Sequence, residues 1–217
     1  MTKPLTIDVW SDVMCPFCYM GDALLAKALD TFPHNEQVEV RYRSYQLMPG
    51  LPTDSGVNAT EILVKAKGIP RAQAIAMNEQ VAARAAELGL EYHLDRAVVV
   101  NTRSAQRLSQ FALAEGKQRA FMQRLFRAYF TEGKNVGKYD VLADLAVEVG
   151  LDRARALEVL HSGGFDSDVA ADQRQANAIG IRGVPFFVFD GKYAVSGAQP
   201  VEAFRKALDE AWGEGRR

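Results

Sequence analysis

Hydrophobic and polar residues alternate at the start of the chain, with Leu5, Ile7 and Val9 on one side, and this pattern predicts a short β-strand ending near Ser11. Residues 38–47 alternate in the same way and predict a second strand. The apolar residues between the two strands recur at helical spacing. This order of elements favours a parallel pair of strands joined by a helical crossover. The apolar positions of the expected helix are Ala23, Leu24, Ala28, Leu29 and Phe32.

The middle of the chain has a different pattern. A loop rich in proline and glycine covers 47–56, and from about Asn58 the apolar residues follow the period of 3.6 that is typical of helices. The stretch 96–101 is strand-like, but it fits the lead-in to a helix equally well. The predicted helices span 58–67, 70–88, 101–115, 117–131, 138–149, 152–161 and 165–179.

Strand character returns at 184–197, where two apolar runs flank Asp190 and Gly191, a strong signal for a β-hairpin. A last helix is expected over about 200–212, because its apolar residues fall on one stripe. The chain therefore predicts an α/β protein with the element order βαβ…ββα.

The helical stretch divides this α/β pattern into two parts. We expect residues 1–57 and 165–217 to form one discontinuous domain, and residues 58–164 to form an all-helical insertion domain. No internal repeat or low-complexity segment suggests another organisation.

The charge balance limits the partners of the protein. Its 217 residues include 26 lysines and arginines against 27 aspartates and glutamates, a formal net charge of −1. Such a balance offers no broad attraction for phosphate backbones or anionic lipid, so we expect neither nucleic acid nor membrane as a partner. The N-terminus has no apolar stretch of signal-peptide length, and no window approaches the ~18 apolar residues of a membrane span. We therefore expect a cytoplasmic protein.

The two cysteines of the chain, Cys15 and Cys18, are separated by Pro16 and Phe17. In a reducing compartment such a close pair is more often catalytic or metal-binding than a structural disulfide. Proline is favoured at the first position of a helix, which places Cys15 at the N-cap. The unpaired N–H groups and the positive end of the helix dipole would stabilise a thiolate at that position.

Cys18 lies one helical turn after Cys15 on the same face. Cβ atoms at this spacing are ~5–6 Å apart and a disulfide requires ~3.5–4.5 Å, so a small adjustment of the first turn would close the bond. Two neighbours limit the stabilisation of the thiolate, since Phe17 supplies no cation and an ionised Asp12 would oppose it. We therefore expect a moderate redox pair rather than an extreme oxidant.

Two other interpretations of the cysteine pair are a zinc site and an inert pair. A zinc site would need two further ligands, but the chain has no other cysteine, and His34, His93 and His161 stand alone without ligand spacing. We therefore expect no metal. A Cys-x-x-Cys in a cytosolic βαβ context is the pattern of a redox motif, so redox chemistry is the favoured interpretation.

A second element precedes the predicted hairpin, at Gly183, Val184 and Pro185. A proline in a sheet is confined to an edge or to the first position of a strand. Only about 5–6% of X–Pro bonds are cis. The local sequence therefore indicates no more than the start of a strand at Pro185.

The segment WSDVMCPFCYMG, followed much later by GIRGVPFFVF and YAVSGAQP, closely resembles the thioredoxin-fold DsbA family. More narrowly it resembles the FrnE-like dithiol–disulfide oxidoreductases, whose relatives include 2-hydroxychromene-2-carboxylate isomerase and kappa-class glutathione transferase. The segments NTRSAQRL and LFRAYFTEGKNVG resemble the helical insertion of that branch. The resemblance covers nearly the whole chain and implies a thioredoxin fold for the discontinuous domain.

The resemblance also implies roles for individual residues. Cys15 would be the nucleophile and Cys18 the resolving cysteine, with Pro185 as a cis-proline beside them and the Val184 backbone in contact with substrate. Ser196 and Gly197 match the segment that lines the glutathione site in the glutathione-using branch, although a plain strand–helix turn would also explain them. The remaining candidates for substrate binding are Pro16, Phe17, Asn101 and Thr102.

Two positions depart from the family pattern. Gln106 stands where relatives often have histidine, so a role that depends on that histidine has no matching residue here. Thioredoxin-like proteins also keep a buried acid beneath the cysteines, and Asp8 is the candidate. Its offset from Cys15 is one residue longer than usual, so a solvated Asp8 at the strand edge fits equally well.

The favoured function is thiol–disulfide exchange with a protein or small-thiol substrate, in which Cys15 attacks and Cys18 resolves. The alternatives are a glutathione-dependent isomerase or transferase of the same fold, and a chaperone-like binding module without catalysis. We expect no bound cofactor; glutathione is a candidate co-substrate. A homodimer is a candidate assembly, because relatives in the glutathione-using branch are often dimeric.

Overall fold

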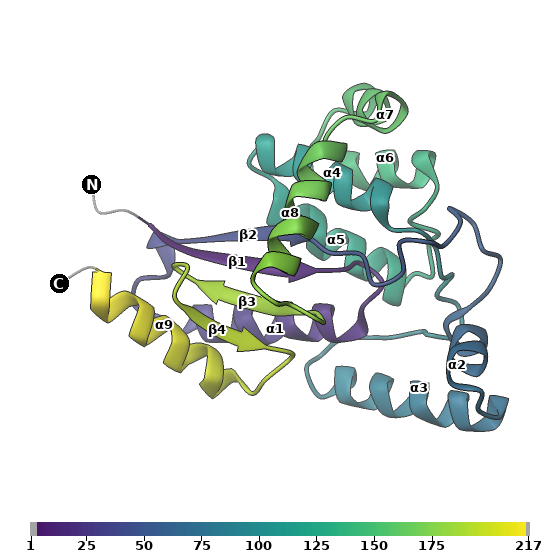
Figure 1. The fold of residues 1–217 in the computed structure, drawn as a ribbon, viewed down its shortest axis with the longest axis horizontal. Coiled ribbons are helices and arrows are strands. Elements are labelled where there is room, and N and C mark those ends of the chain that lie inside the picture. The colour runs from purple at the N-terminus through teal and green to yellow at the C-terminus, as the bar shows by residue number, and fades with distance from the viewer. Residues whose placement is uncertain (1–3, 216–217) are drawn as a thin grey trace.

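A four-stranded sheet with the strand order β2-β1-β3-β4 forms the centre of the computed structural model, which describes residues 4–215 (Figure 1). The strand β1 (Leu5–Ser11) runs parallel to β2 (Val38–Ser44), and the helix α1 (Pro16–Asp30) connects them. The strand β3 (Phe186–Phe189) is antiparallel to β1 and to β4 (Tyr193–Ser196). This arrangement confirms the predicted thioredoxin fold.

The chain between β2 and β3 is helical, as its periodicity predicts, after a short 3₁₀ turn (Asn35–Gln37) that precedes β2. The predicted and observed boundaries of each helix agree within about two residues. The stretch 96–101 forms no strand; a single bridge joins Val98 to Asn58, and the chain then enters a helix. The helices are α2 (Ala59–Lys67), α3 (Arg71–Ala86), α4 (Arg103–Ala114), α5 (Gln118–Phe130), α6 (Tyr139–Glu148), α7 (Arg153–Ser162) and α8 (Asp166–Ala178).

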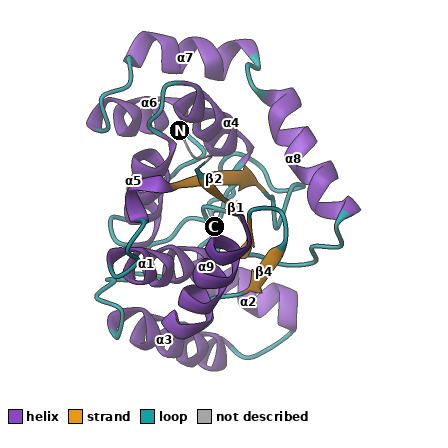
Figure 2. Cartoon of the chain, turned by 90° about the vertical axis from the view of Figure 1, so that its left-hand side faces the viewer, coloured by secondary structure: helices purple, strands orange, loops and turns teal. Residues whose placement is uncertain are grey.

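Helices cover both faces of the sheet. On one face α1 packs beside the last helix, α9 (Val201–Gly215), and on the other face α8 crosses the strands (Figures 1 and 2). Because side chains alternate along a strand, Ile7 and Val9 enter the large core that α1 and α9 complete. Trp10 points to the opposite side, where it packs with Ala176 and Ile181 and donates through Nε1 to the carbonyl of Asp172, 3.2 Å away.

The predicted hairpin is present and is fixed to the first strand. Asp190 and Gly191 both have positive φ angles, 50° and 72°, as a tight turn between two strands requires. The Asp190 N–H donates to the Thr6 carbonyl at 2.8 Å, and its carboxylate accepts from the Thr6 N–H at 3.1 Å. These bonds hold β3 and β4 in register with β1.

The inserted helix α5 is hydrogen-bonded to the sheet. Gln118 at the start of α5 accepts from the Tyr42 N–H at 2.8 Å and donates to the Tyr42 carbonyl at 2.9 Å, which ties α5 to β2. The helices α2 and α3 form a pair at the end of the molecule away from the termini (Figure 1).

The division into domains at 58 and 164 stays a prediction. No helix within residues 4–215 has the length and apolar character needed to cross a membrane.

Candidate functional site

The cysteine pair lies at the first turn of α1. Cys15 is the N-cap, with extended backbone angles (φ −84°, ψ 113°), and Pro16 occupies the first turn, as the sequence predicts. The Cys15 N–H donates to the Asp12 carbonyl at 3.0 Å, which forms a tight turn between β1 and the helix. Both cysteines are free thiols. A turn that is hydrogen-bonded on the strand side and led by proline on the helix side therefore fixes the position of Cys15.

The Cys15 sulfur contacts the strand that follows the helical insertion. Its thiol donates to the carbonyl oxygen of Val184, with an Sγ–O distance of 3.5 Å, and the Val184–Pro185 peptide bond is cis. The sequence predicts that this side chain faces the N–H groups of its own helix, but no such capping bond is present. A thiol can donate to a carbonyl and a thiolate cannot, so this contact belongs to the protonated form of Cys15.

Cys18 lies one turn deeper and is 2% exposed. Burial raises the pKa of the Cys18 thiol well above its ordinary range, and the adjacent Cys15 sulfur raises it further. The Ser11 hydroxyl and the Asp12 amide lower this pKa, but burial has the larger effect. Both thiols are buried, since Cys15 is 3% exposed, and they differ in position. Cys15 lies at the helix end beside Val184, whereas Cys18 lies one turn inside the helix.

Asp12 is the buried acid of this site. Its carboxylate is fully buried and accepts from the Leu47 N–H at 2.8 Å, and the Thr102 side chain lies against it. Burial raises the pKa of Asp12 from 3.8 to about 6, although the hydrogen bonds from Leu47, Thr102 and Met14 lower it. At neutral pH this carboxyl group is therefore mostly ionised, and it takes up a proton in mildly acidic solution.

Asp8 does not occupy the position beneath the cysteines. Its side chain is 19% exposed and accepts from Arg43 Nε at 2.7 Å. Asp8 and Trp10 project from the face of β1 that α8 covers, whereas the cysteines lie on the face with α1, so the alternation of the strand excludes contact. The interpretation of Asp8 as the buried acid is wrong; Asp8 forms a partly exposed ion pair with Arg43 instead.

A second buried carboxyl group lies one turn after Cys18, at Asp22. It accepts from the Tyr42 hydroxyl, and its other oxygen accepts from Gln123 Nε2 at 3.1 Å. Burial raises the pKa of Asp22, while the bonds from Tyr42 and Gln123 lower it. This cluster joins α1, β2 and α5 beneath the cysteine-bearing turn, so it stabilises the packing of these three elements.

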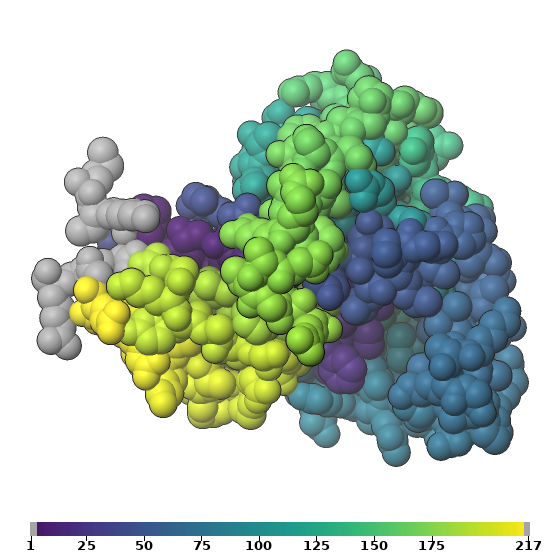
Figure 3. Space-filling model, viewed as in Figure 1, coloured from purple at the N-terminus to yellow at the C-terminus, as the bar shows by residue number. Residues whose placement is uncertain are grey.

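A hollow of about 410 Å³ adjoins Val184 and Pro185. It is lined by residues 180–186 together with Ser196 and Gly197, and the Gly197 N–H donates to the Pro185 carbonyl at 2.8 Å. In the space-filling view, atoms of the purple N-terminal part of the chain reach the surface between the C-terminal strands and the blue α2–α3 pair (Figure 3). The structure thus brings Val184, Pro185, Ser196 and Gly197 together at one edge of the cysteine-bearing turn.

Pro16 and Phe17 face the inserted helices. The Pro16 carbonyl accepts from the Tyr92 hydroxyl at 2.7 Å, and the Phe17 side chain remains 38% exposed. The guanidinium of Arg84, in α3, lies 5.7 Å from the centroid of the Phe17 ring. A cation therefore stands beside the motif, although the motif itself contains none, and no local sequence signal indicates that contact.

Asn101 and Thr102 hold the loop after β2 rather than lining an open surface. Asn101 Nδ2 donates to the carbonyls of Pro49 and Leu51 at 2.8 and 3.0 Å, and its oxygen accepts from Gln46 Nε2 at 2.9 Å. Thr102 is 2% exposed and contacts Asp12. In this structure Asn101 thus fixes the loop, and the Thr102 side chain lowers the pKa of Asp12 by hydrogen bonding to it.

Gln106 fills the position where relatives often have histidine, and it is almost fully buried. Its Nε2 donates to the Ser11 carbonyl at 2.9 Å and to the Tyr45 carbonyl at 3.2 Å. These bonds join the ends of β1 and β2 directly before the cysteine-bearing turn. Gln106 therefore stabilises the position of that turn through these hydrogen bonds. As a neutral amide it takes up no proton.

The arrangement offers sulfur chemistry and no evident metal chemistry. Within the described residues, no three His, Cys, Asp or Glu side chains gather closely enough to hold a metal ion. What the site presents is one thiol at a helix N-terminus, a second thiol buried behind it, a carboxyl group with a raised pKa and an adjacent hollow. These features suit the exchange of disulfide bonds.

The fold and the cysteine pair together define a thioredoxin-fold protein with a dithiol beside a cis-proline. The chain belongs to the DSBA-like thioredoxin domain family, whose model matches residues 6–209. It is 30% identical over 211 residues to the YwbO protein of Bacillus subtilis, covering 94% of this chain and 96% of that protein.

Solved structures show the same fold. A probable DsbA oxidoreductase from Streptomyces coelicolor is 38% identical, with a TM-score of 0.91 over 97% of this chain and 91% of that one. The cytosolic disulfide reductase DsbM from Pseudomonas aeruginosa is 21% identical, with a TM-score of 0.67 over 94% and 97% of the two chains. A 2-hydroxychromene-2-carboxylate isomerase is 15% identical, with a TM-score of 0.71 over 94% and 95%. One fold thus serves disulfide chemistry and isomerisation among these neighbours.

Proposed function

We propose that the protein is a thiol–disulfide oxidoreductase in which Cys15 is the nucleophile and Cys18 the resolving cysteine. The observation that carries this proposal is the position of the Cys15 sulfur, at the N-terminus of α1 and 3.5 Å from the Val184 carbonyl, with a buried Cys18 one turn behind. Membership of the DSBA-like family and the likeness to the Streptomyces coelicolor oxidoreductase support it.

In the reducing direction, the Cys15 thiolate attacks one sulfur of the substrate disulfide, and the other sulfur leaves as a thiolate that takes up a proton. Cys18 then loses its proton and attacks the Cys15 sulfur, which releases the second substrate thiol. The enzyme finishes with a Cys15–Cys18 disulfide and the substrate with two thiols. Asp12 is the proposed proton acceptor for Cys18, because it is the buried carboxyl group at this turn and its pKa of about 6 leaves it ionised at pH 7.

Cis-Pro185 and the Val184 backbone would hold the substrate. In the free protein the Val184 carbonyl accepts a hydrogen bond from the Cys15 thiol. Once Cys15 forms a mixed disulfide, this carbonyl becomes available to a substrate N–H. The hollow beside it, with Ser196 and Gly197 on its border, leaves room for an extended segment. The geometry supports this role, because the same carbonyl can accept first from the Cys15 thiol and then from the substrate.

The test is a pair of single substitutions assayed with a disulfide-bonded peptide. Cys15→Ser should abolish exchange, whereas Cys18→Ser should accumulate a mixed disulfide between Cys15 and the peptide, detectable as an added mass that dithiothreitol removes. A Cys15→Ser protein that still exchanges disulfides would contradict the proposal. Retention of the fold in both variants is checked by circular dichroism.

We further propose that the protein works in the cytoplasm as a reductase. The structural neighbour DsbM is described as a cytosolic disulfide reductase. The direction depends on the reduction potential of the Cys15–Cys18 pair relative to glutathione. Equilibration of the protein in glutathione redox buffers gives that potential, and a value clearly more positive than the cytosolic glutathione couple would contradict the reductase direction.

A second candidate function is glutathione-dependent transfer or isomerisation. The hollow beside Val184 includes Arg182, a cation that suits a glutathione carboxylate, and DsbM has been solved with glutathione. This function needs one activated thiol and no enzyme disulfide. A Cys18→Ser protein that keeps full glutathione-dependent activity would favour it over disulfide exchange.

A further inference from the structure

A second hollow adjoins the cysteine-bearing turn and is lined almost entirely by apolar side chains. Its volume is about 420 Å³, and it is enclosed between the start of α1 and the helix pair α2–α3. Met14, Pro16 and Phe17 form its wall on the side of the motif, and Leu63 and Val81 contribute from α2 and α3. No polar network fills it, so an occupant would be held by the burial of apolar surface.

This hollow is tied to the chemistry by its position in the chain. Met14 and Pro16 are the residues on either side of Cys15, so an object in the hollow lies within a residue or two of any group bonded to the Cys15 sulfur. The hollow beside Val184 shares no lining residue with the apolar hollow. A substrate bonded to Cys15 could therefore place its backbone along Val184 and a side chain in the apolar hollow.

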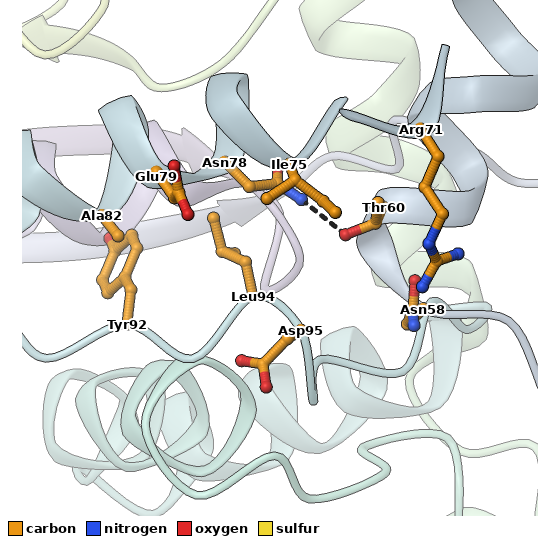
Figure 4. Close-up of a pocket in the computed structure, with 10 residues that line it drawn as sticks. All are labelled: Asn58, Thr60, Arg71, Ile75, Asn78, Glu79, Ala82, Tyr92, Leu94 and Asp95. Carbon is orange, nitrogen blue, oxygen red and sulfur yellow. Dashed lines mark hydrogen bonds between the residues drawn. The ribbon is translucent and has the colours of Figure 1, made fainter. Parts of the chain in front are cut away.

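A polar hollow behind it does not share this relationship. Figure 4 shows that hollow between α3 and the segment 92–95, with Leu94 extending toward α3 and with Glu79, Arg71 and Asp95 around it. It shares Asn78 and Leu94 with the apolar hollow but includes no residue of the cysteine-bearing turn. The apolar hollow is therefore the one that a group attached to the attacked sulfur can enter.

Lys67 gives the apolar hollow a charge. It is the one charged residue among those that line the hollow, its side chain is exposed, and it forms no ion pair with any described residue. The last residue of α2 thus places an unpaired ammonium group beside an apolar chamber. That combination suits an apolar group that carries a carboxylate close by.

We propose that this hollow is a specificity site for an aromatic or branched aliphatic group next to the attacked sulfur, with a carboxylate facing Lys67. The inference rests on the proposed disulfide exchange and names its substrate class. Disulfides of peptides that end in a cysteine followed by a bulky apolar residue have this chemistry, as do disulfides of small aromatic thiols with a carboxylate. The reaction is the one described above, so the reduced enzyme itself supplies both electrons.

The experiment measures single-turnover reduction of symmetric disulfides of the peptides acetyl-Gly-Cys-Phe and acetyl-Gly-Cys-Ser by pre-reduced protein. Each peptide is made with a free C-terminus and as the amide, and each rate is divided by the rate with dithiothreitol, which removes differences in intrinsic reactivity. We expect the Phe acid to be preferred over the Ser acid by about tenfold, since a Phe side chain is buried in one complex only. The Phe acid should exceed its amide by about threefold.

Variants of the lining separate the two contributions. Leu63→Asp should bring the Phe-to-Ser ratio close to one, and Val81→Trp, which fills the hollow without adding charge, should do the same if the first variant folds poorly. Lys67→Gln should remove the preference for the acid while keeping the preference for Phe. The control is Ile75→Asp, which changes an exposed apolar residue of α3 outside the apolar hollow and should leave every ratio unchanged.

The outcomes distinguish the inference from the proposed function. If the wild-type protein reduces none of the peptides, disulfide exchange itself is contradicted. If it reduces the Phe and Ser peptides at equal normalised rates, or if both Leu63→Asp and Val81→Trp retain the wild-type ratio in folded protein, exchange stands and the specificity site is overturned. Equal effects of Lys67→Gln on acid and amide would overturn the role of the carboxylate.

Discussion

Arg84 lies over Phe17, with its guanidinium carbon 5.7 Å from the centroid of the aromatic ring. The two residues come from different parts of the protein, since Phe17 lies between the cysteines and Arg84 is in α3 of the inserted helices. Arg84 also donates through Nη2 to the Ala198 carbonyl at 2.9 Å, in the turn that follows β4. One side chain therefore connects the insertion, the motif and the C-terminal strands.

This contact predicts an electrostatic effect on Cys15. Arg84→Gln removes the cation next to the motif and should slow the alkylation of Cys15 by iodoacetamide at pH 7 by about threefold in low salt, a size typical of an exposed charge. Arg84→Lys keeps the charge and should fall between wild type and Arg84→Gln. The difference should shrink in 1 M NaCl, because salt screens exposed charges. An equal slowing at low and high salt would show that the effect is structural.

The raised pKa of Cys18 predicts a large difference in reactivity between the two thiols. In the reduced protein at pH 8, iodoacetamide should modify Cys15 and leave Cys18 unmodified over the same period, because burial and the adjacent Cys15 sulfur raise the pKa of Cys18 well above its ordinary range. Peptide mapping by mass spectrometry identifies the modified residue. In urea both cysteines should react at similar rates. Rapid modification of Cys18 in the folded protein would contradict the raised pKa of its thiol.

The raised pKa of Asp12 predicts a pH dependence of stability with a definite sign. The folded protein holds the Asp12 proton up to about pH 6, whereas the unfolded chain releases it near pH 3.8. The stability that this group contributes is therefore fully present below pH 3.8 and is lost as the pH rises through 6. The free energy of unfolding of wild type minus that of Asp12→Asn should fall by about 3 kcal/mol between pH 3.5 and pH 7.

Urea denaturation of both proteins across this pH range measures the difference. Other carboxyl groups titrate in both proteins, so their contributions cancel, and the substitution itself adds an offset that does not depend on pH. A difference that is constant with pH would mean that Asp12 has an ordinary pKa. A difference that rises with pH would mean that its carboxylate is stabilised rather than opposed by the fold.

The sequence predicts the elements of this fold well because the evidence for each element is local. Periodicity locates the strands and helices, and Pro16 places Cys15 at the N-cap before any tertiary contact is considered. The stretch 96–101 is the ambiguous case. Most of its apolar residues are buried, but its backbone bonds go to separate residues of an irregular segment rather than to a strand. The Val99 N–H donates to the Val57 carbonyl, and the Ala97 carbonyl accepts from the Ala59 N–H.

The surroundings of the cysteines depend on contacts that no local pattern records. The alternation of side chains along β1 could have excluded Asp8 from the site, because residues 7, 9 and 11 share the face that α1 covers. The burial of Asp12, in contrast, depends on Leu47 and Thr102 from distant segments. Along the chain, Arg84 is separated from Phe17 by the rest of α1, by β2, by α2 and by most of α3. Residue types at short spacing thus identify the reactive atoms, while their electrostatics come from the assembled fold.

Gly21 in α1 faces Pro185 and the strand β3 that follows it, and this close approach predicts that a larger residue at Gly21 destabilises the protein. A Cβ atom at Gly21 would lie 2.9 Å from Cζ of Phe187 and 3.0 Å from Cγ of Pro185. Both rings are held in the packed core, so Gly21→Ala should push α1 away from β3. We expect the free energy of unfolding to fall by about 1–3 kcal/mol, in spite of the better helix propensity of alanine.

The same displacement should change the chemistry, because it alters the position of Pro185 relative to Cys15. We expect Gly21→Ala to slow disulfide exchange by about tenfold under conditions where the protein is fully folded. Gly213→Ala is the matched control, since Gly213 is also helical and no atom lies within 4 Å of the added Cβ. That variant should gain up to about 1 kcal/mol of stability and keep the wild-type rate. If Gly21→Ala exchanges disulfides at the wild-type rate, the spacing between α1 and the cis-proline strand does not control the reaction.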